Sequence, residues 1–302
     1  DLIHTLMGND VSSNRTGTVF LYSFDDSSFS NTTLQHTLGR GRSIDHYNNG
    51  TDQFGNSVSL DTASDGSARL AVGARNSDGV RNDTNPDHLF SNTNNKGTVY
   101  LFSFTGTNAN NNSFDGGELK AVIGHGYTQA RTTDTANAAF YDRDENGLYP
   151  NGLDISSHLD TSDNFGQGVS LVGTMLAVGK HNDDGVSDTT TNTGAVYLFT
   201  FDDTSFTNLT HVGTIGDGYT GGKNINQSLG TSDYFGTGVS LDGNRLVVGA
   251  WRGDGSGNSR NDSGDVYLYT FSDSAFSGGA LAGMIGHGYT GGKNINQTLD
   301  TG

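Results

Sequence analysis

The sequence predicts an all-β fold of the β-propeller type, in which about four repeated units each contain a four-stranded antiparallel sheet. Three observations lead to this fold class. Four apolar runs recur with a period of about 70 residues, turn-forming residues fill the polar positions, and the runs are short and rich in β-branched and aromatic residues. We therefore expect a loop-rich protein built from strands.

The repeat opens with an apolar run that contains a Phe-Gly pair. The pattern Asp-x-Phe-Gly-x-x-Val-Ser-Leu occupies residues 52–60, 163–171 and 233–241. A second run contains a Val-Gly pair, at residues 69–74, 175–180 and 245–250, and a third has four copies, at residues 17–22, 97–102, 194–199 and 264–269. A fourth, weaker run leads into Gly124, Gly216 and Gly286. Each run is expected to form one strand of a blade.

These runs divide the chain into four repeats within one predicted domain, residues 1–302. The first repeat, residues 1–51, lacks the Phe-Gly run and is incomplete, and the second, residues 52–162, carries long insertions. The third and fourth repeats, residues 163–232 and 233–302, are uninterrupted. The chain opens at Asp1 without a signal-peptide pattern, so we expect it to be part of a longer chain or of an assembly.

The composition agrees with a strand and loop protein. The chain has 45 Gly and only 2 Pro, and its acidic residues are aspartates apart from Glu118 and Glu145. The formal net charge of −17 repels phosphate backbones, which argues against a nucleic-acid partner, but it attracts divalent cations and makes Ca²⁺ a candidate cofactor. The absence of cysteine excludes a disulfide scaffold, and the absence of a run of 18 apolar residues argues against membrane insertion.

The Phe-Gly run followed by Val-Gly-Ala resembles the FG-GAP repeat of integrin α-chain propellers, and is most similar to the bacterial variety in large secreted or surface proteins. The resemblance covers all four repeats outside residues 105–160. It implies an extracellular propeller used for binding or adhesion, often with calcium in the hairpin between the first two strands. In this chain that hairpin is short and poor in carboxylates, at residues 172–174 and 242–244, whereas calcium takes six to eight oxygens.

The loops after the second run are the next candidates for calcium. Asp78, Asp184 and Asp254 stand at equivalent positions, each followed by Gly, and Asp188 follows Asp184 by four residues. The recurring oxygens are suited to calcium, but Asp-Gly is also a common way to make a tight turn without any ion. Both interpretations are open from the sequence.

A further calcium candidate lies in the insertion of the second repeat. Asp142, Asp144 and Asn146 place oxygens at the first, third and fifth positions of an EF-hand-type loop, with Gly147 sixth. The twelfth position is Leu153, so either Asp154, one place later, closes a nonstandard loop, or the segment is a solvated acidic turn.

The sequence shows no positioned nucleophile, no Gly-x-Ser-x-Gly pattern and no spaced histidine cluster, so we expect no enzymatic activity and no catalytic residues. The candidate ligand-binding residues are Trp251 and Arg252, an aromatic ring and a cation side by side on a loop, where the ring would stack on a glycan or a partner.

Three functions follow as hypotheses. The first is a non-enzymatic adhesive or structural module of a bacterial surface or secreted protein, stabilised by calcium. The second is a subunit of an extracellular filament that assembles end to end by sharing strands or blades. The third is a glycan-binding, lectin-like propeller. The expected partners are a second copy of the chain, or a protein or glycan of a cell surface.

Overall fold

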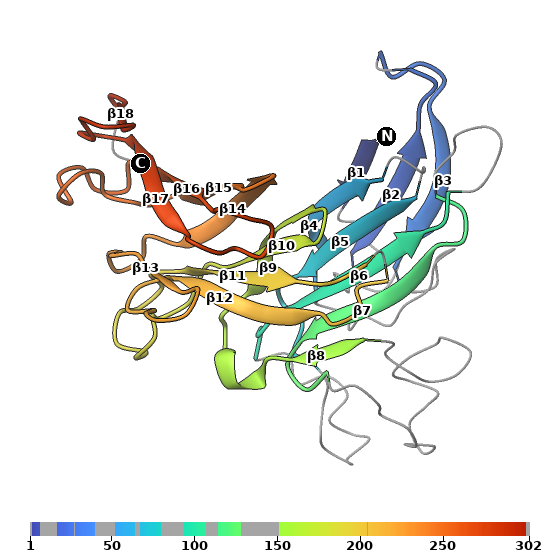
Figure 1. Cartoon of the computed structure of the whole chain (residues 1–302), viewed down its shortest axis with the longest axis horizontal. Helices are drawn as coiled ribbons and strands as arrows, with labels where there is room; N and C mark the ends of the chain where they lie inside the picture. The colour runs from blue at the N-terminus through green and yellow to red at the C-terminus, as the bar shows by residue number, and fades with distance from the viewer. Residues whose placement is uncertain are drawn as a thin grey trace. The chain divides into compact units, whose positions relative to one another are not determined.

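Figure 1 shows the computed structural model, which describes residues 2–6, 17–26, 28–39, 52–63, 67–79, 94–106, 114–127, 151–203 and 205–299. These residues form strands β1 to β18 and one short 3-10 helix, η2 (Ser156–His158). The described part of the chain contains no helix with the length and hydropathy needed to cross a lipid bilayer.

The strands form four sheets, one in each predicted repeat. The first sheet contains, in spatial order, β1 (Leu2–Leu6), β2 (Thr18–Ser23) and β3 (Thr33–Leu38). The second contains β4 (Phe54–Thr62), β5 (Ala68–Ala74), β6 (Thr98–Phe104), β7 (Glu118–Gly124) and β8 (Gly152–Asp154). The third contains β9 (Phe165–Val172), β10 (Met175–Lys180), β11 (Ala195–Thr200), β12 (Thr210–Gly216) and β13 (Ile225–Asn226). The fourth contains β14 (Phe235–Asp242), β15 (Arg245–Ala250), β16 (Asp265–Thr270), β17 (Ala280–Gly286) and β18 (Ile295–Asn296).

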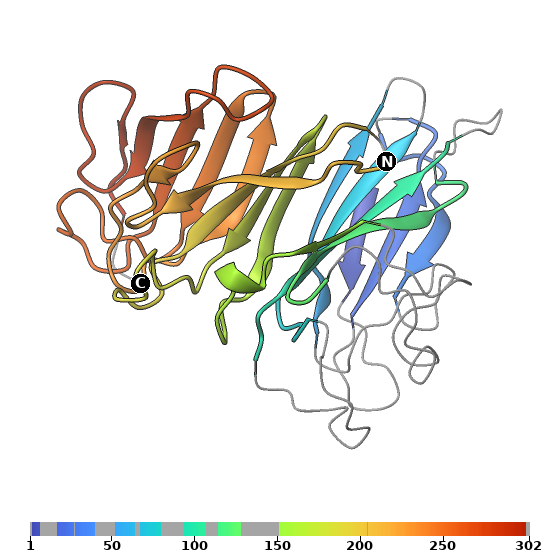
Figure 2. The same cartoon turned by 60° about the horizontal axis from the view of Figure 1, so that its bottom comes forward.

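The predicted fold class is confirmed, because the described chain is all-β and consists of repeated, blade-like antiparallel sheets (Figure 2). The four predicted runs are the four antiparallel strands of the complete repeats. Each complete repeat also has a fifth, very short strand that was not predicted. These strands are β8, β13 and β18, and each pairs in parallel with the strand before it.

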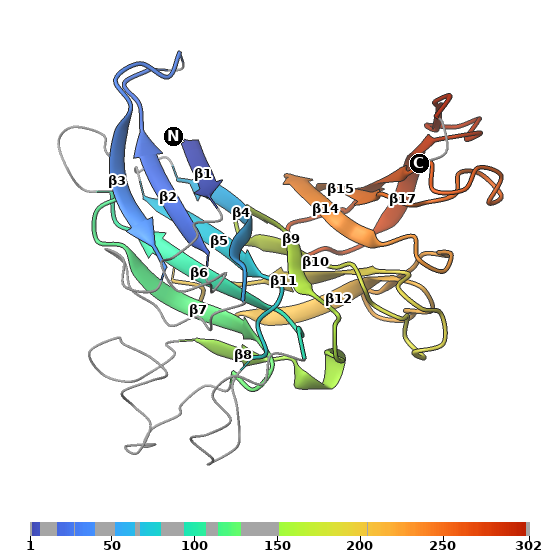
Figure 3. The ribbon, with the colours of Figure 1, turned by 180° about the vertical axis from the view of Figure 1, so that it is seen from behind.

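By its internal contacts the chain divides into two compact units, residues 1–162 with 203–207 and residues 163–202 with 208–302. In the first unit, one apolar core contains Val19 and Leu21 of the first sheet together with Phe54, Leu70 and Tyr100 of the second. In the second unit, β14 packs across β9 and β10 (Figure 3). The core of that unit combines residues of the third and fourth sheets, among them Ala177, Val196, Leu198, Phe235, Leu246 and Val248.

The Phe of the Phe-Gly pair is a core residue in each complete repeat. Phe54, Phe165 and Phe235 are all buried. Phe235 meets the ring of Tyr267 edge-on, with the ring centroids 5.1 Å apart. Burial of one such side chain contributes about 1.5–3 kcal/mol, and edge-on ring contacts add to it.

The Gly that follows permits a bulge at the start of the strand. In the fourth sheet the register shifts between Phe235 and Gly238, and Gly236 adopts a φ of +90°, which residues with a Cβ rarely adopt. The bulge turns the start of β14 toward the preceding repeat, where Phe235 donates its N–H to the carbonyl of Thr193 at 2.9 Å. In the fourth repeat the Phe-Gly pair therefore joins the sheet to the third repeat as well as opening a strand.

Candidate functional site

The predicted calcium ligands Asp78, Asp184 and Asp254 lie in the loops that follow β5, β10 and β15, each four residues after the strand ends. In each loop the carboxylate accepts backbone N–H groups from the far end of the same loop. Asp184 Oδ1 lies 2.7 Å from the nitrogen of Asn192, and Asp254 Oδ1 lies 2.8 Å from that of Asp262. Asp78 Oδ1 accepts from residues 94 and 95 at 3.2 and 2.9 Å. These aspartates thus close the loops by hydrogen bonding, a role that needs no ion.

Asp188 lies within the same loop of the third repeat. Its backbone N–H bonds to the carbonyl of Gly185 at 3.2 Å, and its φ of +51° places it in the left-handed region. Asp and Asn tolerate this conformation better than most residues. Asp188 therefore forms a turn, which accounts for the spacing of four residues after Asp184.

Asp154, the predicted closing ligand of the insertion, lies at the end of β8. Its Oδ1 accepts the backbone N–H groups of Gly126 and Ser156, each at 2.9 Å, and the hydroxyl of Ser156. Asn226 and Asn296 hold the same place beside β12 and β17, where they accept the N–H groups of Gly218 and Gly288. Asp154 is therefore the acidic version of a recurring turn residue. Asp142, Asp144 and Asn146 lie outside the described residues.

Within the described ranges, no three or more His, Asp or Glu side chains gather closely enough to hold a metal ion. Calcium binding by the predicted ligands stays a prediction.

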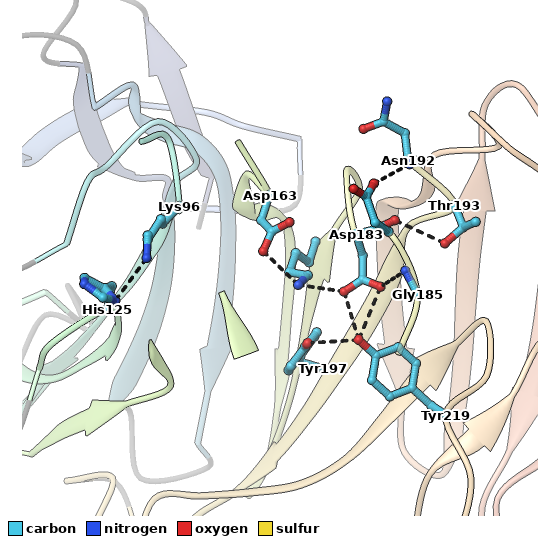
Figure 4. Close-up of polar contacts among 11 residues, drawn as sticks. Lys96, His125, Asp163, Asp183, Gly185, Asn192, Thr193, Tyr197 and Tyr219 are labelled. Atoms are coloured by element: carbon cyan, nitrogen blue, oxygen red, sulfur yellow. Dashed lines mark hydrogen bonds and ion pairs between the residues drawn. The ribbon is translucent and has the colours of Figure 1, made fainter. Parts of the chain in front are cut away.

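Behind the loop of the third repeat lies a buried ion-pair cluster that the sequence analysis did not identify (Figure 4). Lys180 Nζ lies 2.8 Å from Asp163 Oδ2 and 2.7 Å from Asp183 Oδ2, and all three side chains are at most 5 % exposed. The hydroxyl of Tyr219 donates to Asp183 Oδ2 at 3.0 Å, and the N–H of Gly185 donates to Asp183 Oδ1 at 2.8 Å.

The two carboxylates keep Lys180 charged. Burial alone would lower the pKa of Lys180, but the charges of Asp183 and Asp163 outweigh burial and hold this pKa above its ordinary value. The lysine is therefore an ammonium ion at neutral pH, held between two carboxylates.

In the fourth repeat, different residues occupy the positions that correspond to this ion-pair cluster. Ala250 replaces Lys180, Gly253 replaces Asp183, and Asp265 replaces Ala195. The hydroxyl of Tyr289 donates to Asp265 Oδ2 at 3.0 Å, and the N–H of Gly255 donates to it at 3.2 Å. A Cβ on Gly253 would lie 2.4 Å from that oxygen. The Asp265 carboxylate thus takes the position and the hydrogen bonds of the Asp183 carboxylate, but it comes from the neighbouring strand.

Asp233 is the counterpart of Asp163 in the fourth repeat and accepts the N–H of Gly230 at 2.7 Å. Burial, followed by the charges of Asp254 and Asp265, raises the pKa of Asp233 to about 6. The fourth repeat therefore keeps both carboxylates of the cluster but has no lysine between them.

The second repeat keeps only one of the two acids of this cluster, because Asp52, which is 5 % exposed, is the counterpart of Asp163. Ser77 stands where the third repeat has Asp183, and its hydroxyl lies 2.9 Å from that of Thr98. Tyr127 is the buried counterpart of Tyr219. The three versions differ in their charged residues on the same backbone arrangement. A position-by-position comparison of the repeats would have shown these changes, but not that their side chains meet at one place.

Trp251 and Arg252, the predicted ligand-binding residues, form a surface platform with Tyr234. Trp251 is 59 % exposed and stacks on Tyr234, with ring centroids 5.6 Å apart and an interplanar angle of 27°. The Arg252 guanidinium lies 5.5 Å from the Trp251 ring and 5.8 Å from the Tyr234 ring. Two parallel hydrogen bonds to Asp262, of 2.8 and 2.9 Å, hold the guanidinium in place.

The platform belongs to the fourth repeat. The third repeat has His181 and Asn182 at the positions of Trp251 and Arg252, and Asn164 at that of Tyr234. Asn182 donates to Asn164 Oδ1 at 2.8 Å instead of lying over a pair of rings. An exposed tryptophan that stacks on a half-buried tyrosine, with a fixed cation beside it, offers a flat apolar face and hydrogen-bond donors to a ligand.

Comparison with known families finds two segments, residues 155–199 and 229–269, that match the model of the FG-GAP repeat. They cover most of the Phe-Gly, Val-Gly and aromatic strands of the third and fourth repeats. A search of curated proteins finds no significant match.

Proposed function

Because residues 155–199 and 229–269 are FG-GAP repeats, which are non-catalytic modules of extracellular, adhesion-type proteins, we propose that this chain is an extracellular adhesive or structural module. The loops of the repeats offer the binding surface, and the sheets offer the framework that holds them.

The platform of Trp251, Tyr234 and Arg252 is the observation that carries a binding role. Sugar rings present C–H groups that pack on aromatic faces, and guanidinium groups donate to sugar hydroxyls and carboxylates. The platform brings these groups together from two segments, Tyr234 before β14 and Trp251 and Arg252 after β15. We therefore take a glycan of a cell surface as the ligand.

A glycan array tests this role. The chain is expected to bind a restricted set of glycans, Trp251→Ala to lose at least tenfold in affinity, and Trp251→Phe to keep part of it. Val186→Ala is the matched control, because Val186 is a 54 % exposed apolar residue on the corresponding loop of the third repeat. Equal binding by Trp251→Ala and the parent chain would contradict the proposed site.

A second candidate function, self-assembly, is supported by the outer face of the fourth sheet. In the third sheet, Ala177 and Leu198 lie in the core against the fourth sheet. Their counterparts are Val247, which is 38 % exposed, and Leu268, which is half-buried. This apolar face is suited to another blade, and we propose that a second copy of the chain supplies it.

Sedimentation velocity and electron microscopy test this self-assembly. The parent chain is expected to form oligomers or filaments, and Val247→Asp is expected to remain monomeric because a carboxylate would be buried in the interface. Asp242→Asn is the control, since that side chain is 88 % exposed at the end of the neighbouring strand β14. A strictly monomeric parent chain at high concentration would contradict the proposal.

Calcium as a stabilising ion is supported by the oxygen spacing of Asp142, Asp144 and Asn146. Calorimetry of the chelated chain with added Ca²⁺ tests this site. We expect saturable heat that is lost in the double variant Asp142→Asn and Asp144→Asn, whereas heat that persists unchanged in that variant would rule out these ligands.

A further inference from the structure

Asp265 in the fourth repeat has a carboxylate oxygen without a partner in a buried environment. The residue is 5 % exposed, and its Oδ1 forms no hydrogen bond with any described residue, whereas its Oδ2 accepts from Tyr289 and Gly255. Asp233, which is 6 % exposed, is the second buried acid of the same repeat. Neither carboxylate takes part in an ion pair with the described residues.

Two buried carboxylates with no cation are unfavourable, because each loses its hydration without an opposite charge to replace it. The nearby arginine does not supply that charge. Arg252 is held by Asp262, whose two oxygens take both of its hydrogen bonds. Asp254, which also faces the cluster, adds negative charge.

The third repeat shows how the same backbone arrangement neutralises its two acids. Lys180 Nζ sits 2.8 Å from Asp163 and 2.7 Å from Asp183. Asp233 is the counterpart of Asp163, and Asp265 replaces the carboxylate of Asp183. At the position of Lys180 the fourth repeat has only the methyl group of Ala250, so the ammonium is missing while both of its partners are kept.

We propose that the fourth repeat binds a hard divalent cation between Asp233 and Asp265, at the place that the Lys180 ammonium takes in the third repeat. A doubly charged ion balances both carboxylates, and carboxylate oxygens are ligands that Ca²⁺ and Mg²⁺ prefer. The described residues provide two carboxylates rather than three. Water and main-chain carbonyl oxygens would complete the coordination, as they do in many Mg²⁺ and Ca²⁺ sites.

Terbium luminescence gives a direct test of this site, because Tb³⁺ replaces Ca²⁺ and is excited by a nearby aromatic ring. Tyr289 is hydrogen-bonded to Asp265, and Trp251 follows Ala250 in the chain. The measurement uses the full chain carrying Asp142→Asn and Asp144→Asn, so that the insertion makes no contribution. We expect a saturable signal that Ca²⁺ or Mg²⁺ displaces, and the relative potency of the two ions identifies the cation.

The ligands are tested by Asp233→Asn with Asp265→Asn, which keeps the shape of both side chains. The affinity for Tb³⁺ is expected to fall at least tenfold. A signal of unchanged affinity would place the ion elsewhere and overturn the proposal. The absence of any Tb³⁺ signal before these two substitutions would also overturn the proposal. A stability that rises on acidification and does not change with divalent ions would overturn it too, because a proton would then neutralise the pair of carboxylates.

A chimeric variant tests the comparison between repeats. The changes Ala250→Lys, Gly253→Asp and Asp265→Ala copy the third repeat into the fourth, and removal of the Asp265 side chain makes room for the new carboxylate. Both chains are measured with Asp142→Asn and Asp144→Asn in place. The melting temperature of the chain with the original fourth repeat is expected to rise with divalent ion, whereas that of the chimera is expected to be insensitive to it. If the chimera does not fold, the Asn variants still decide the question.

The glycan and assembly tests depend on Trp251 and Val247, so their outcomes are independent of this one.

Discussion

A Cβ atom on Gly179 would lie 1.8 Å from the carbonyl oxygen of Gly236. The glycine of the Val-Gly pair in the third repeat therefore touches the backbone of the Phe-Gly pair in the fourth. The two glycines of the repeat thus meet across the interface of successive sheets. In this unit the motif therefore also forms the contact between the third and fourth repeats.

This contact predicts that Gly179→Ala destabilises the second compact unit. The methyl group would meet backbone atoms, which cannot rotate away as a side chain would, so we expect a loss of about 3 kcal/mol. The matched control is Gly249→Ala in the fourth repeat, where the nearest atom to a new Cβ is 3.9 Å away. Urea unfolding followed by fluorescence measures both. Equal stability of the two variants would contradict the close contact.

Gly249→Ala also bears on self-assembly. If a strand of a second copy covers the fourth sheet as the fourth sheet covers the third, its backbone would approach Gly249. The variant would then keep the stability of the single chain but weaken the association, which sedimentation velocity detects.

The buried cluster of the third repeat predicts a large effect of Lys180→Met. Removal of the ammonium leaves Asp163 and Asp183 buried without a cation, and breaking such a pair from one side costs about 3–5 kcal/mol. Adding Asp163→Asn and Asp183→Asn to Lys180→Met should restore most of the loss, because the uncompensated charges are removed. Chemical denaturation of the single and triple variants measures the difference. A triple variant no more stable than Lys180→Met would show that packing, rather than charge, is the cause.

The strand pattern could be predicted because it depends on local sequence. Phe165 and Phe235 follow Asp at the same spacing and open equivalent strands. The short strand at Ile225 and Asn226 could not be predicted, because two residues carry no alternation. Its position is fixed by Asn224 and Asn226, which accept N–H groups of Thr214 and Gly218.

The charge cluster was missed for a different reason. Asp183 and Asp265 stand at different positions of the repeat, yet their carboxylates reach the same place from two neighbouring segments. A linear comparison shows a lost acid at Gly253 and a gained acid at Asp265 as separate changes. Only the contact between Gly253 and Asp265 shows that one replaces the other.

The turn between β16 and β17 predicts an acid-sensitive contribution from Asp273. Its Oδ1 accepts the N–H groups of Ala275 and Ser277 at 2.9 and 3.0 Å. These hydrogen bonds, of which the one from Ser277 has the largest effect, hold the pKa of Asp273 below its ordinary value of 3.8. Because the folded-state pKa is depressed, the stabilisation is present above pH 3.8 and is lost as the pH falls through the folded-state pKa.

Asp273→Asn should therefore be less stable than the parent chain at pH 7, and the difference should shrink as the pH falls below 3.8. Denaturant unfolding at a series of pH values measures it, with Asp242→Asn as the exposed control. A difference that stays constant with pH would mean that the charge of Asp273 plays no part.

The crossover that ends the third repeat predicts a paired result for Gln227 and Gln297. Gln227 is 9 % exposed, and its Oε1 accepts the hydroxyl of Tyr269 in the fourth sheet at 2.8 Å. Gln297 holds the equivalent position at the end of the fourth repeat and is exposed. Gln227→Ala would leave the Tyr269 hydroxyl buried without an acceptor, at a cost of about 1–3 kcal/mol.

Gln297→Ala should change the stability of the isolated chain by less than about 0.5 kcal/mol, as is usual for exposed positions. Thermal unfolding of both variants measures the contrast, and Tyr269→Phe with Gln227→Leu, which removes both polar partners, should recover part of the loss. Similar destabilisation by the two alanine variants at low protein concentration would contradict the assignment of Gln227 as the residue that joins the crossover to the next sheet. A Gln297→Ala effect that appears only at high concentration would instead place the second crossover in the interface between copies, because the same glutamine would then be covered by the next blade.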